Sequence, residues 1–142
     1  MVDDNELRQA MMVLETYEAQ LETLDRQIRL LQVSLEDTMR ARDAFKALAD
    51  AKEGDEILIP VGASSFIHAK VTEKRSAIIG IGNRIHAEKS LEESAEFMAK
   101  SVDEISAALK ESVATFEEIQ KMTSNLSMAI ETEYQSRQQS VQ

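Results

Sequence analysis

Two long segments with a seven-residue hydrophobic repeat flank one short segment rich in β-branched residues, and this arrangement constrains the fold more than any other feature. The first repeat runs through Leu7, Leu14, Leu21, Ile28 and Leu35, with further apolar residues three places after the first four. A second repeat runs through residues 91–130. Such repeats predict two long amphipathic helices, each with one apolar seam.

Capping signals bound the first helix. Asp3, with Glu6 three places later, can form a capping box over the first unpaired N–H groups, and Gly54 can close the helix in a left-handed conformation. We therefore predict a helix of about 48 residues, roughly 70 Å long. Further along it, Thr38 and Arg42 fall on seam positions. Met39, Phe45 and Leu48 would take over the seam, which predicts a stutter that locally unwinds the coil.

The second helix has a clearer start, because Ser90 and Glu93 form a second capping box directly before the apolar repeat. We expect this helix to reach about Arg137, and the Gln- and Ser-rich tail 135–142 to fray.

The two helices have similar predicted lengths, which favours an antiparallel hairpin within one chain. That pairing would place Met12 near Ile130 and Leu21 near Lys121. The alternative, in which each helix pairs with another chain, has the same periodicity. We predict the hairpin because the lengths match around a single insert.

The insert predicts four short strands, at residues 57–61, 66–71, 77–81 and 84–88, arranged as two β-hairpins in series. The runs 57–59 and 77–79 carry apolar side chains to both faces. About 33 residues cannot cover two faces of a sheet by themselves. We therefore predict that the sheet joins sheets of other chains, the alternative being that it folds back on its own helices. The predicted oligomerisation residues are Ile57, Leu58, Ile59, Val61, Phe66, Ile67, Ile78, Ile79, Ile81 and Ile85.

Composition and motifs argue against several classes of function. The net charge of -10 disfavours nucleic acid and acidic membranes as partners. The chain has no Cys and no long apolar run, so we expect a cytoplasmic protein. No Cys is available to complete a zinc site with His68 and His86, although a carboxylate such as Glu88 could do so in principle, and we expect both histidines to face solvent. The Gly80–Gly82 pair opens no helix, so it predicts a turn rather than a nucleotide loop. We predict no catalytic residues, no metal and no cofactor.

The insert and its flanks resemble the alpha subunit of archaeal prefoldin. The residues that carry the resemblance are Ile59-Pro60-Val61-Gly62-Ala63-Ser64-Ser65-Phe66-Ile67-His68-Ala69, Ile78-Ile79-Gly80-Ile81-Gly82-Asn83, Glu88-Lys89-Ser90 and Glu92-Glu93-Ser94-Ala95. The resemblance implies a mainly α fold with a small β insert, in which an antiparallel two-helix coiled coil is joined by two β-hairpins that assemble into an oligomeric β-barrel platform. Residues 1–54 would form the N-terminal helix, 55–89 the platform hairpins and 90–142 the C-terminal helix, as one structural unit.

The resemblance also implies partners and an activity. Two alpha and four beta subunits would form a hexamer that captures unfolded polypeptides between the distal tips of its coiled coils, without ATP, and delivers them to a group II chaperonin. Two other interpretations remain open. One is a structural coiled-coil adaptor that binds no unfolded protein, and the other is a transcription-linked or filament-forming relative.

A tip that holds unfolded protein needs exposed, adaptable apolar side chains, and methionine suits such a surface. The predicted hairpin brings residues near both ends of the chain together, where methionines accumulate and the repeat weakens. Ordinary seam packing would explain some of these residues equally well. The predicted client-binding residues are Met1, Val2, Leu7, Met11, Met12, Leu14, Met128, Ile130, Tyr134 and Val141.

Overall fold

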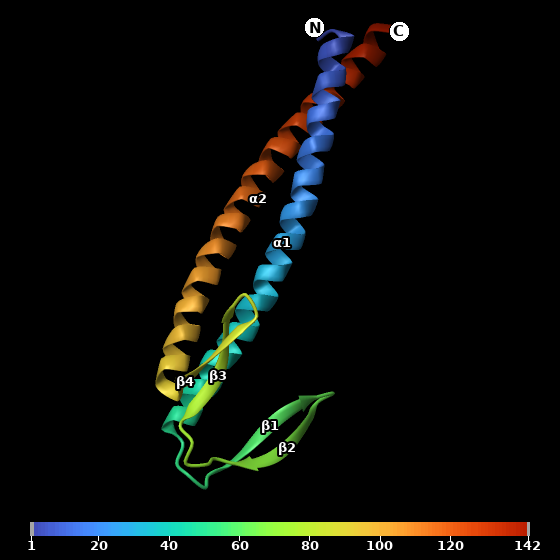
Figure 1. Ribbon diagram of the computed structural model, residues 1–142. Coiled ribbons are helices and arrows are strands. Elements are labelled where there is room, and N and C mark those ends of the chain that lie inside the picture. Colours follow the sequence, from blue (N-terminus) through green and yellow to red (C-terminus); the bar gives the residue numbers. More distant parts are fainter. Residues whose placement is uncertain (1, 142) are drawn as a thin grey trace. The chain divides into compact units, whose positions relative to one another are not determined.

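The computed structural model describes residues 2–141 and contains two long helices separated by two β-hairpins (Figure 1). In chain order the elements are α1 (Asp4–Asp50), β1 (Glu56–Gly62), β2 (Ser65–Lys70), β3 (Ser76–Gly82), β4 (Ile85–Ser90) and α2 (Leu91–Val141). This order confirms the predicted mainly α fold with a β insert. The chain divides into two compact units, unit 1 (Met1–Val33, Ser106–Gln142) and unit 2 (Ser34–Ile105), and each helix contributes to both.

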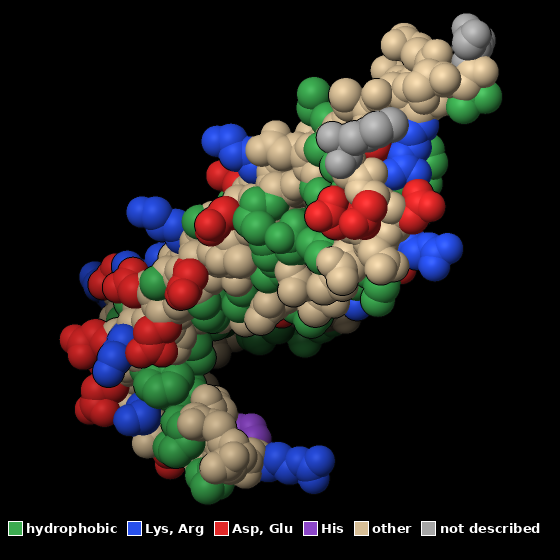
Figure 2. Space-filling view, turned by 90° about the horizontal axis from the view of Figure 1, so that it is seen from above, with side chains coloured by type: hydrophobic (Ala, Val, Ile, Leu, Met, Phe, Trp, Pro, Cys, Tyr) green, Lys and Arg blue, Asp and Glu red, His purple; other side chains and the backbone are tan. Residues whose placement is uncertain are grey.

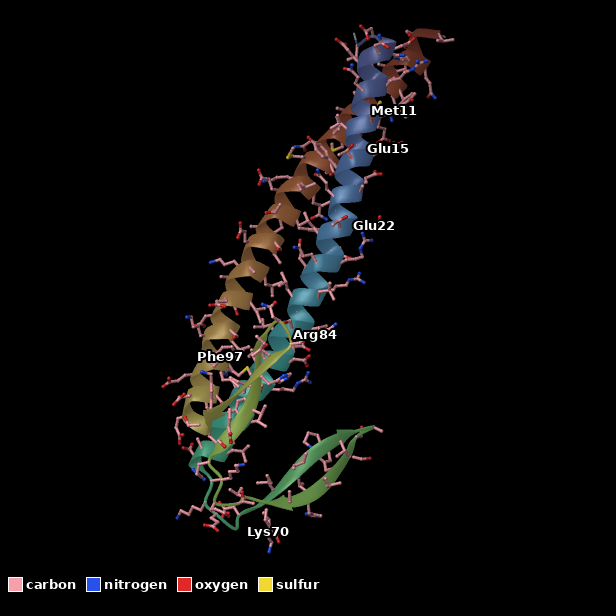
Figure 3. The ribbon with its side chains drawn as sticks, viewed as in Figure 1. Met11, Glu15, Glu22, Lys70, Arg84 and Phe97 are labelled. Atoms are coloured by element: carbon pink, nitrogen blue, oxygen red, sulfur yellow. The ribbon has the colours of Figure 1, made fainter. Side chains whose placement is uncertain are left out.

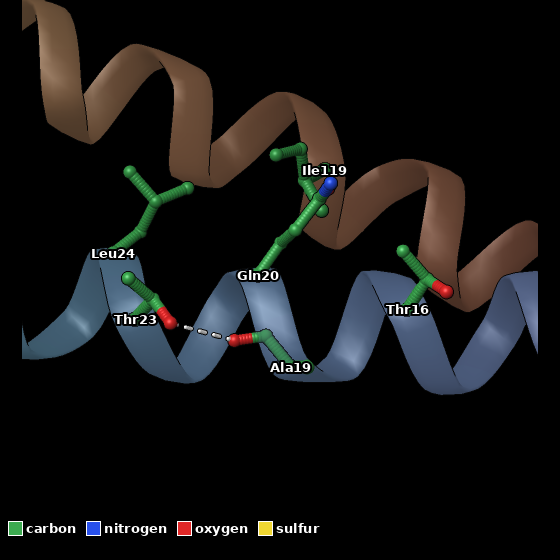
Figure 4. Close-up of a pocket in the computed structure, with 6 residues that line it drawn as sticks. All are labelled: Thr16, Ala19, Gln20, Thr23, Leu24 and Ile119. Carbon is green, nitrogen blue, oxygen red and sulfur yellow. Dashed lines mark hydrogen bonds between the residues drawn. The ribbon is translucent and has the colours of Figure 1, made fainter.

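Unit 1 consists of the first part of α1 and the last part of α2, packed antiparallel. Tyr134 contacts Met11 and Arg137 contacts Asp4, so contacts nearer the end of α2 involve residues nearer the start of α1. This offset agrees with the predicted antiparallel register. Ile119 of α2 faces α1 at a shallow hollow of about 450 Å³ on the side of the seam (Figure 4), lined by Thr16, Ala19, Gln20, Thr23, Leu24 and Ile119.

The start of α1 agrees with the prediction, and its end does not. The Glu6 N–H donates to the Asp3 carboxylate at 2.8 Å, and the Asp3 N–H donates to the Glu6 carboxylate at 3.3 Å, which confirms the capping box. The helix ends at Asp50 rather than at Gly54. Gly54 has a φ of +90°, but its N–H donates to the Val71 carbonyl at 2.8 Å, so it belongs to the turn that leads into β1.

A side chain distant in sequence satisfies the carbonyls at the end of α1. The Arg75 guanidinium, just before β3, donates to the Ala51 carbonyl at 2.7 Å and to the Ala49 carbonyl at 2.5 Å. These carbonyls have no partner further along the helix, and a cation there also complements the helix dipole. The predicted end at Gly54 was wrong because a tertiary contact supplies the cap.

The start of α2 is capped by Ser90, whose hydroxyl accepts from the Glu93 N–H at 3.1 Å. The helix then continues to Val141, beyond the predicted end near Arg137, and includes most of the tail that we expect to fray. Arg137 and Tyr134 bind residues of α1 and its N-terminal flank in this part of the helix.

The burial pattern of α1 does not follow the predicted stutter at Met39. Thr38 and Arg42 are half-buried and Met39 is exposed, while Phe45 and Leu48 are half-buried as expected. The Thr38 hydroxyl donates to the Ser34 carbonyl at 2.7 Å, which satisfies its polar atom, and the long Arg42 stem can cover apolar surface while its head reaches water. The seven-residue repeat therefore continues through two polar side chains.

The two β-hairpins are built alike. β1 pairs with β2 and β3 with β4, both antiparallel, as predicted. Ala63-Ser64 and Asn83-Arg84 form the turns with positive φ at both residues, and the register shifts at Gly62 and Gly82, which also have positive φ. This is a two-residue type I′ turn beside a glycine bulge. Arg84, predicted in a strand, therefore lies in the turn.

The β3–β4 hairpin packs on its own unit, which corrects the prediction that both faces await other chains. Ile79 is only 2% exposed, and its cross-strand partner Ala87 is half-buried. A two-stranded sheet cannot cover one of its own faces, so the cover of Ile79 comes from elsewhere in unit 2. Leu91, Ala95 and Val102 of α2 are also buried in that unit. By contrast, β1 and β2 are exposed almost throughout.

Within residues 2–141, no helix is apolar over a stretch long enough to cross a membrane.

Candidate functional site

The apolar residues predicted at the distal tip differ in exposure. We define the distal tip as residues 2–14 and 128–141 of unit 1, where both ends of the chain lie together (Figure 1). Leu14 and Ile130 are half-buried, Leu7 is only 8% exposed, and Met1 lies outside the described residues. The side chains on the surface are Val2, Met11, Met12, Met128, Tyr134 and Val141. The distal tip therefore presents exposed apolar side chains around the buried side chain of Leu7.

Two of these exposed residues meet across the helices. The Tyr134 hydroxyl donates to the Met11 sulfur at 3.5 Å. Beside this contact α2 carries a shallow hollow of about 500 Å³, lined by Tyr134, Arg137, Gln138 and Val141. The ring of Tyr134, the thioether of Met11 and the aliphatic side chain of Val141 thus lie near one open surface. Such a surface suits contact with apolar side chains of varied shape.

Arg137 is the polar centre of the distal tip. Its guanidinium donates to the Asp4 carboxylate at 2.5 Å, to the Val2 carbonyl at 2.7 Å and, on its own helix, to the Glu133 carboxylate at 3.1 Å. We call these four residues the Arg137 cluster. The planar fork of the Arg137 guanidinium lets this one side chain donate to three acceptors. The ammonium group of a lysine is less suited to such an arrangement.

Ionisation in the cluster follows from these contacts. The hydrogen bond from Arg137 and its positive charge lower the pKa of Asp4 below the usual value of 3.8. The hydrogen bonds to Asp4 and Glu133 raise the pKa of Arg137 above its usual value. Both groups therefore stay charged throughout the physiological range.

The sequence prediction at the tip named apolar residues and missed the Arg137 cluster. The sequence did contain one sign of this cluster. Glu133 and Arg137 are four residues apart on a predicted helix, a spacing that favours ion pairs. The predicted antiparallel register also places Asp4 close to Arg137. Val2 carries no comparable signal, because it takes part through its backbone carbonyl.

Acidic side chains accompany the apolar ones near the tip. Met11, Glu15 and Glu22 follow one another on α1 at spacings of four and seven residues, which places them on one face (Figure 3). Asp and Glu side chains also lie scattered among hydrophobic ones on the face that Figure 2 shows. Like charges on an apolar tip disfavour its association with a second copy.

The hairpins form a second exposed apolar surface. Of the predicted oligomerisation residues, Ile79 is buried within unit 2 and Ile57 is half-buried. The exposed ones are Leu58, Ile59, Val61, Phe66, Ile67, Ile78, Ile81 and Ile85. On β1–β2 these side chains come from consecutive residues and so occupy both faces. Contiguous apolar surface of this kind is typical of an interaction site.

The part of the chain that the structure describes contains no group of three or more His, Cys, Asp or Glu side chains arranged to hold a metal ion. His68 and His86 are both exposed strand residues, in β2 and β4.

Known proteins share both the sequence pattern and the fold. The family model described as Prefoldin subunit matches residues 17–136. Prefoldin subunit alpha 1 of Methanocaldococcus jannaschii is 34% identical over 134 residues, which cover 94% of this chain and 92% of that protein. Prefoldin subunit alpha of Methanothrix thermoacetophila is 33% identical over 107 residues, covering 75% of this chain and 70% of that protein.

Two solved structures have the same fold at low sequence identity. A chain in the cryo-EM structure of filamentous PFD from Methanocaldococcus jannaschii has a TM-score of 0.62 at 21% identity, covering 86% of this chain and 98% of that chain. The prefoldin beta subunit from Thermococcus strain KS-1 has a TM-score of 0.60 at 10% identity, covering 94% of this chain and 95% of that one. The match over most of its length, together with the named archaeal relatives, shows that this chain belongs to the prefoldin family, with the archaeal alpha subunits.

Proposed function

We propose that this chain is a chaperone subunit that holds non-native proteins at its distal tip without ATP and delivers them to a group II chaperonin. The observation that carries the proposal is the set of exposed apolar side chains where the chain ends meet, above all Met12, Met128 and Tyr134. Flexible and aromatic apolar groups can adapt to many unfolded sequences. Family membership supports the proposal.

Assembly is the second part of the proposal. We infer that the exposed residues of the hairpins pair with those of beta subunits to form a β-barrel platform, in a hexamer of two alpha and four beta chains. The exposed apolar face of β1–β2 supports this, because an isolated hairpin has little stability in water. The Ile79 side chain takes no direct part, since it is buried within unit 2.

A pair of substitutions tests the tip without altering the coiled-coil seam. Replacing Met12 and Met128, which are 66% and 63% exposed, by Gln removes apolar surface and leaves the half-buried residues in place. The assembled complex with co-expressed beta subunits should then bind a permanently unfolded polypeptide about tenfold more weakly. Suppression of its aggregation without ATP should weaken in parallel.

The matched control replaces Leu30 and Val33, which are 72% and 58% exposed on α1 outside the tip, by Gln. This control should bind the unfolded polypeptide as the unmodified complex does. Equal binding by the control and the tip variant would contradict the tip model. An assembled complex that never suppresses aggregation would instead support a structural adaptor.

A further inference from the structure

Two side chains from one turn of α2, Tyr134 and Arg137, bind the N-terminal segment on both sides of Leu7. Arg137 binds the Val2 carbonyl and the Asp4 carboxylate on the N-terminal side, at 2.7 and 2.5 Å. Tyr134 binds the Met11 sulfur on the C-terminal side, at 3.5 Å. Because Leu7 lies between these attachments, the turn of α2 around residues 134–137 must run beside it.

Leu7 is the one buried residue of α1, all of whose residues the structure describes. The contacts of Arg137 and Tyr134 on either side of Leu7 bring α2 beside it, so α2 is the element placed to cover it. The exposed tip residues therefore surround an apolar side chain that is out of reach of any partner while the two helices stay together.

The ends of helices open more readily than their interiors, since their last N–H and C=O groups lack helical partners. The Asp3–Glu6 capping box stabilises the first turn of α1 as a helix. Because both of its residues belong to the N-terminal segment, it does not join that segment to α2. The polar contacts that join this segment to α2 are those of Arg137. Without them, burial of Leu7 and the contact of Tyr134 with Met11 are left to hold the tip closed.

We propose that Arg137 is a positioning residue that holds the distal tip closed over Leu7 and thereby limits the apolar surface offered to a non-native protein. This inference rests on the proposed function at the same tip. In the closed tip, the exposed large apolar side chains among the described residues are Val2, Met11, Met12, Val13, Met128, Tyr134 and Val141. Release of the Arg137 cluster lets the helix ends separate more often, and each opening adds Leu7 to the binding surface.

The experiment replaces Arg137 by Gln in the assembled complex and measures two quantities. Amide hydrogen exchange over residues 2–12 should become about fivefold faster, the upper range for loss of an exposed ion pair. The Kd for reduced, carboxymethylated α-lactalbumin, used as a permanently unfolded probe, should fall by a similar factor. R137K, which keeps the charge but not the guanidinium fork, should give a smaller change in both.

The matched control is R29Q. Arg29 binds Asp25 at 2.9 Å within α1, so its loss removes an ion pair without affecting contact between the helices. This control should change neither exchange over residues 2–12 nor the Kd. The double variant R137Q/L7Q should keep the fast exchange but lose the gain in affinity, because the newly uncovered side chain is then polar.

The outcomes separate this inference from the proposed function. Unchanged exchange in R137Q would show that Arg137 does not close the tip. Faster exchange with an unchanged or weaker affinity would show that Leu7 adds nothing to binding, which also overturns the inference. If neither the unmodified complex nor R137Q binds the probe, the proposed holding function itself is wrong.

Discussion

The carboxylate of Asp4 illustrates how a residue on a fully exposed helix end can still depend on a residue far along the chain. Its pKa is lowered by the hydrogen bond and the charge of Arg137, 133 residues away. A carboxyl group with a lowered folded-state pKa stabilises the folded state at pH values above its unfolded pKa. That contribution disappears as the pH falls through the folded-state value.

Substitution of Arg137 should therefore move the Asp4 titration. In the assembled complex, carbon NMR of labelled Asp carboxyl groups should place the pKa of Asp4 below 3.8, and R137Q should return it towards that value. The ion pair should accordingly open only in acid, and at neutral pH it should be constant. An identical Asp4 titration in both proteins would contradict the contact.

At the scale of elements, β3 divides its two neighbouring isoleucines between two environments. Ile79 is 2% exposed and belongs to the core of unit 2, whereas Ile78 is 72% exposed on the opposite face. This follows from the alternation of side chains along a strand. The two residues therefore have different predicted effects on the protein.

An Asp at position 78 should disrupt assembly and leave the chain folded. I78D should keep its helical circular dichroism but fail to form the complex with beta subunits in native mass spectrometry, because a charge in an apolar interface is costly. L30D is a well-matched control, since Leu30 is also 72% exposed but lies on α1. A full complex with I78D would contradict the assigned surface. An Asp at position 79 would instead destabilise unit 2 itself.

At the scale of the whole molecule, the proposal separates two activities along one chain, assembly by the hairpins and client binding by the distal tip. The two surfaces draw on different residues, in units 2 and 1 respectively. Removing one surface should therefore leave the activity of the other intact.

Deletion of residues 1–12 together with 131–142 tests this separation. The deletion removes most of the exposed tip residues and the Arg137 cluster, but no residue of the hairpins. Native mass spectrometry should still find the full complex with beta subunits, whereas suppression of client aggregation should be lost. Full suppression by an assembled deletion variant would rule out the tip as the client site.

The sequence alone determined the two helices, the two hairpins and the caps at Asp3 and Ser90, and it favoured the antiparallel register that the contacts of Tyr134 and Arg137 show. These features depend on local causes, namely a seven-residue repeat, side chains that bind nearby backbone N–H groups, and turns next to glycine. The geometry that the two turns share needed only a few consecutive residues in each. The apolar character of the tip and the hairpins could likewise be predicted from composition along the chain.

Only the tertiary structure decided where α1 ends, which face of β3 is buried, and how the chain ends are joined. Arg75 caps carbonyls 24 and 26 residues before it, and Arg137 binds groups 133 and 135 residues before it. Such contacts depend on which of many charged side chains the packing of helices brings into reach. No local pattern distinguishes these two arginines, because hydrophobic burial sets the positions of the elements and the polar contacts then form between the groups that happen to meet.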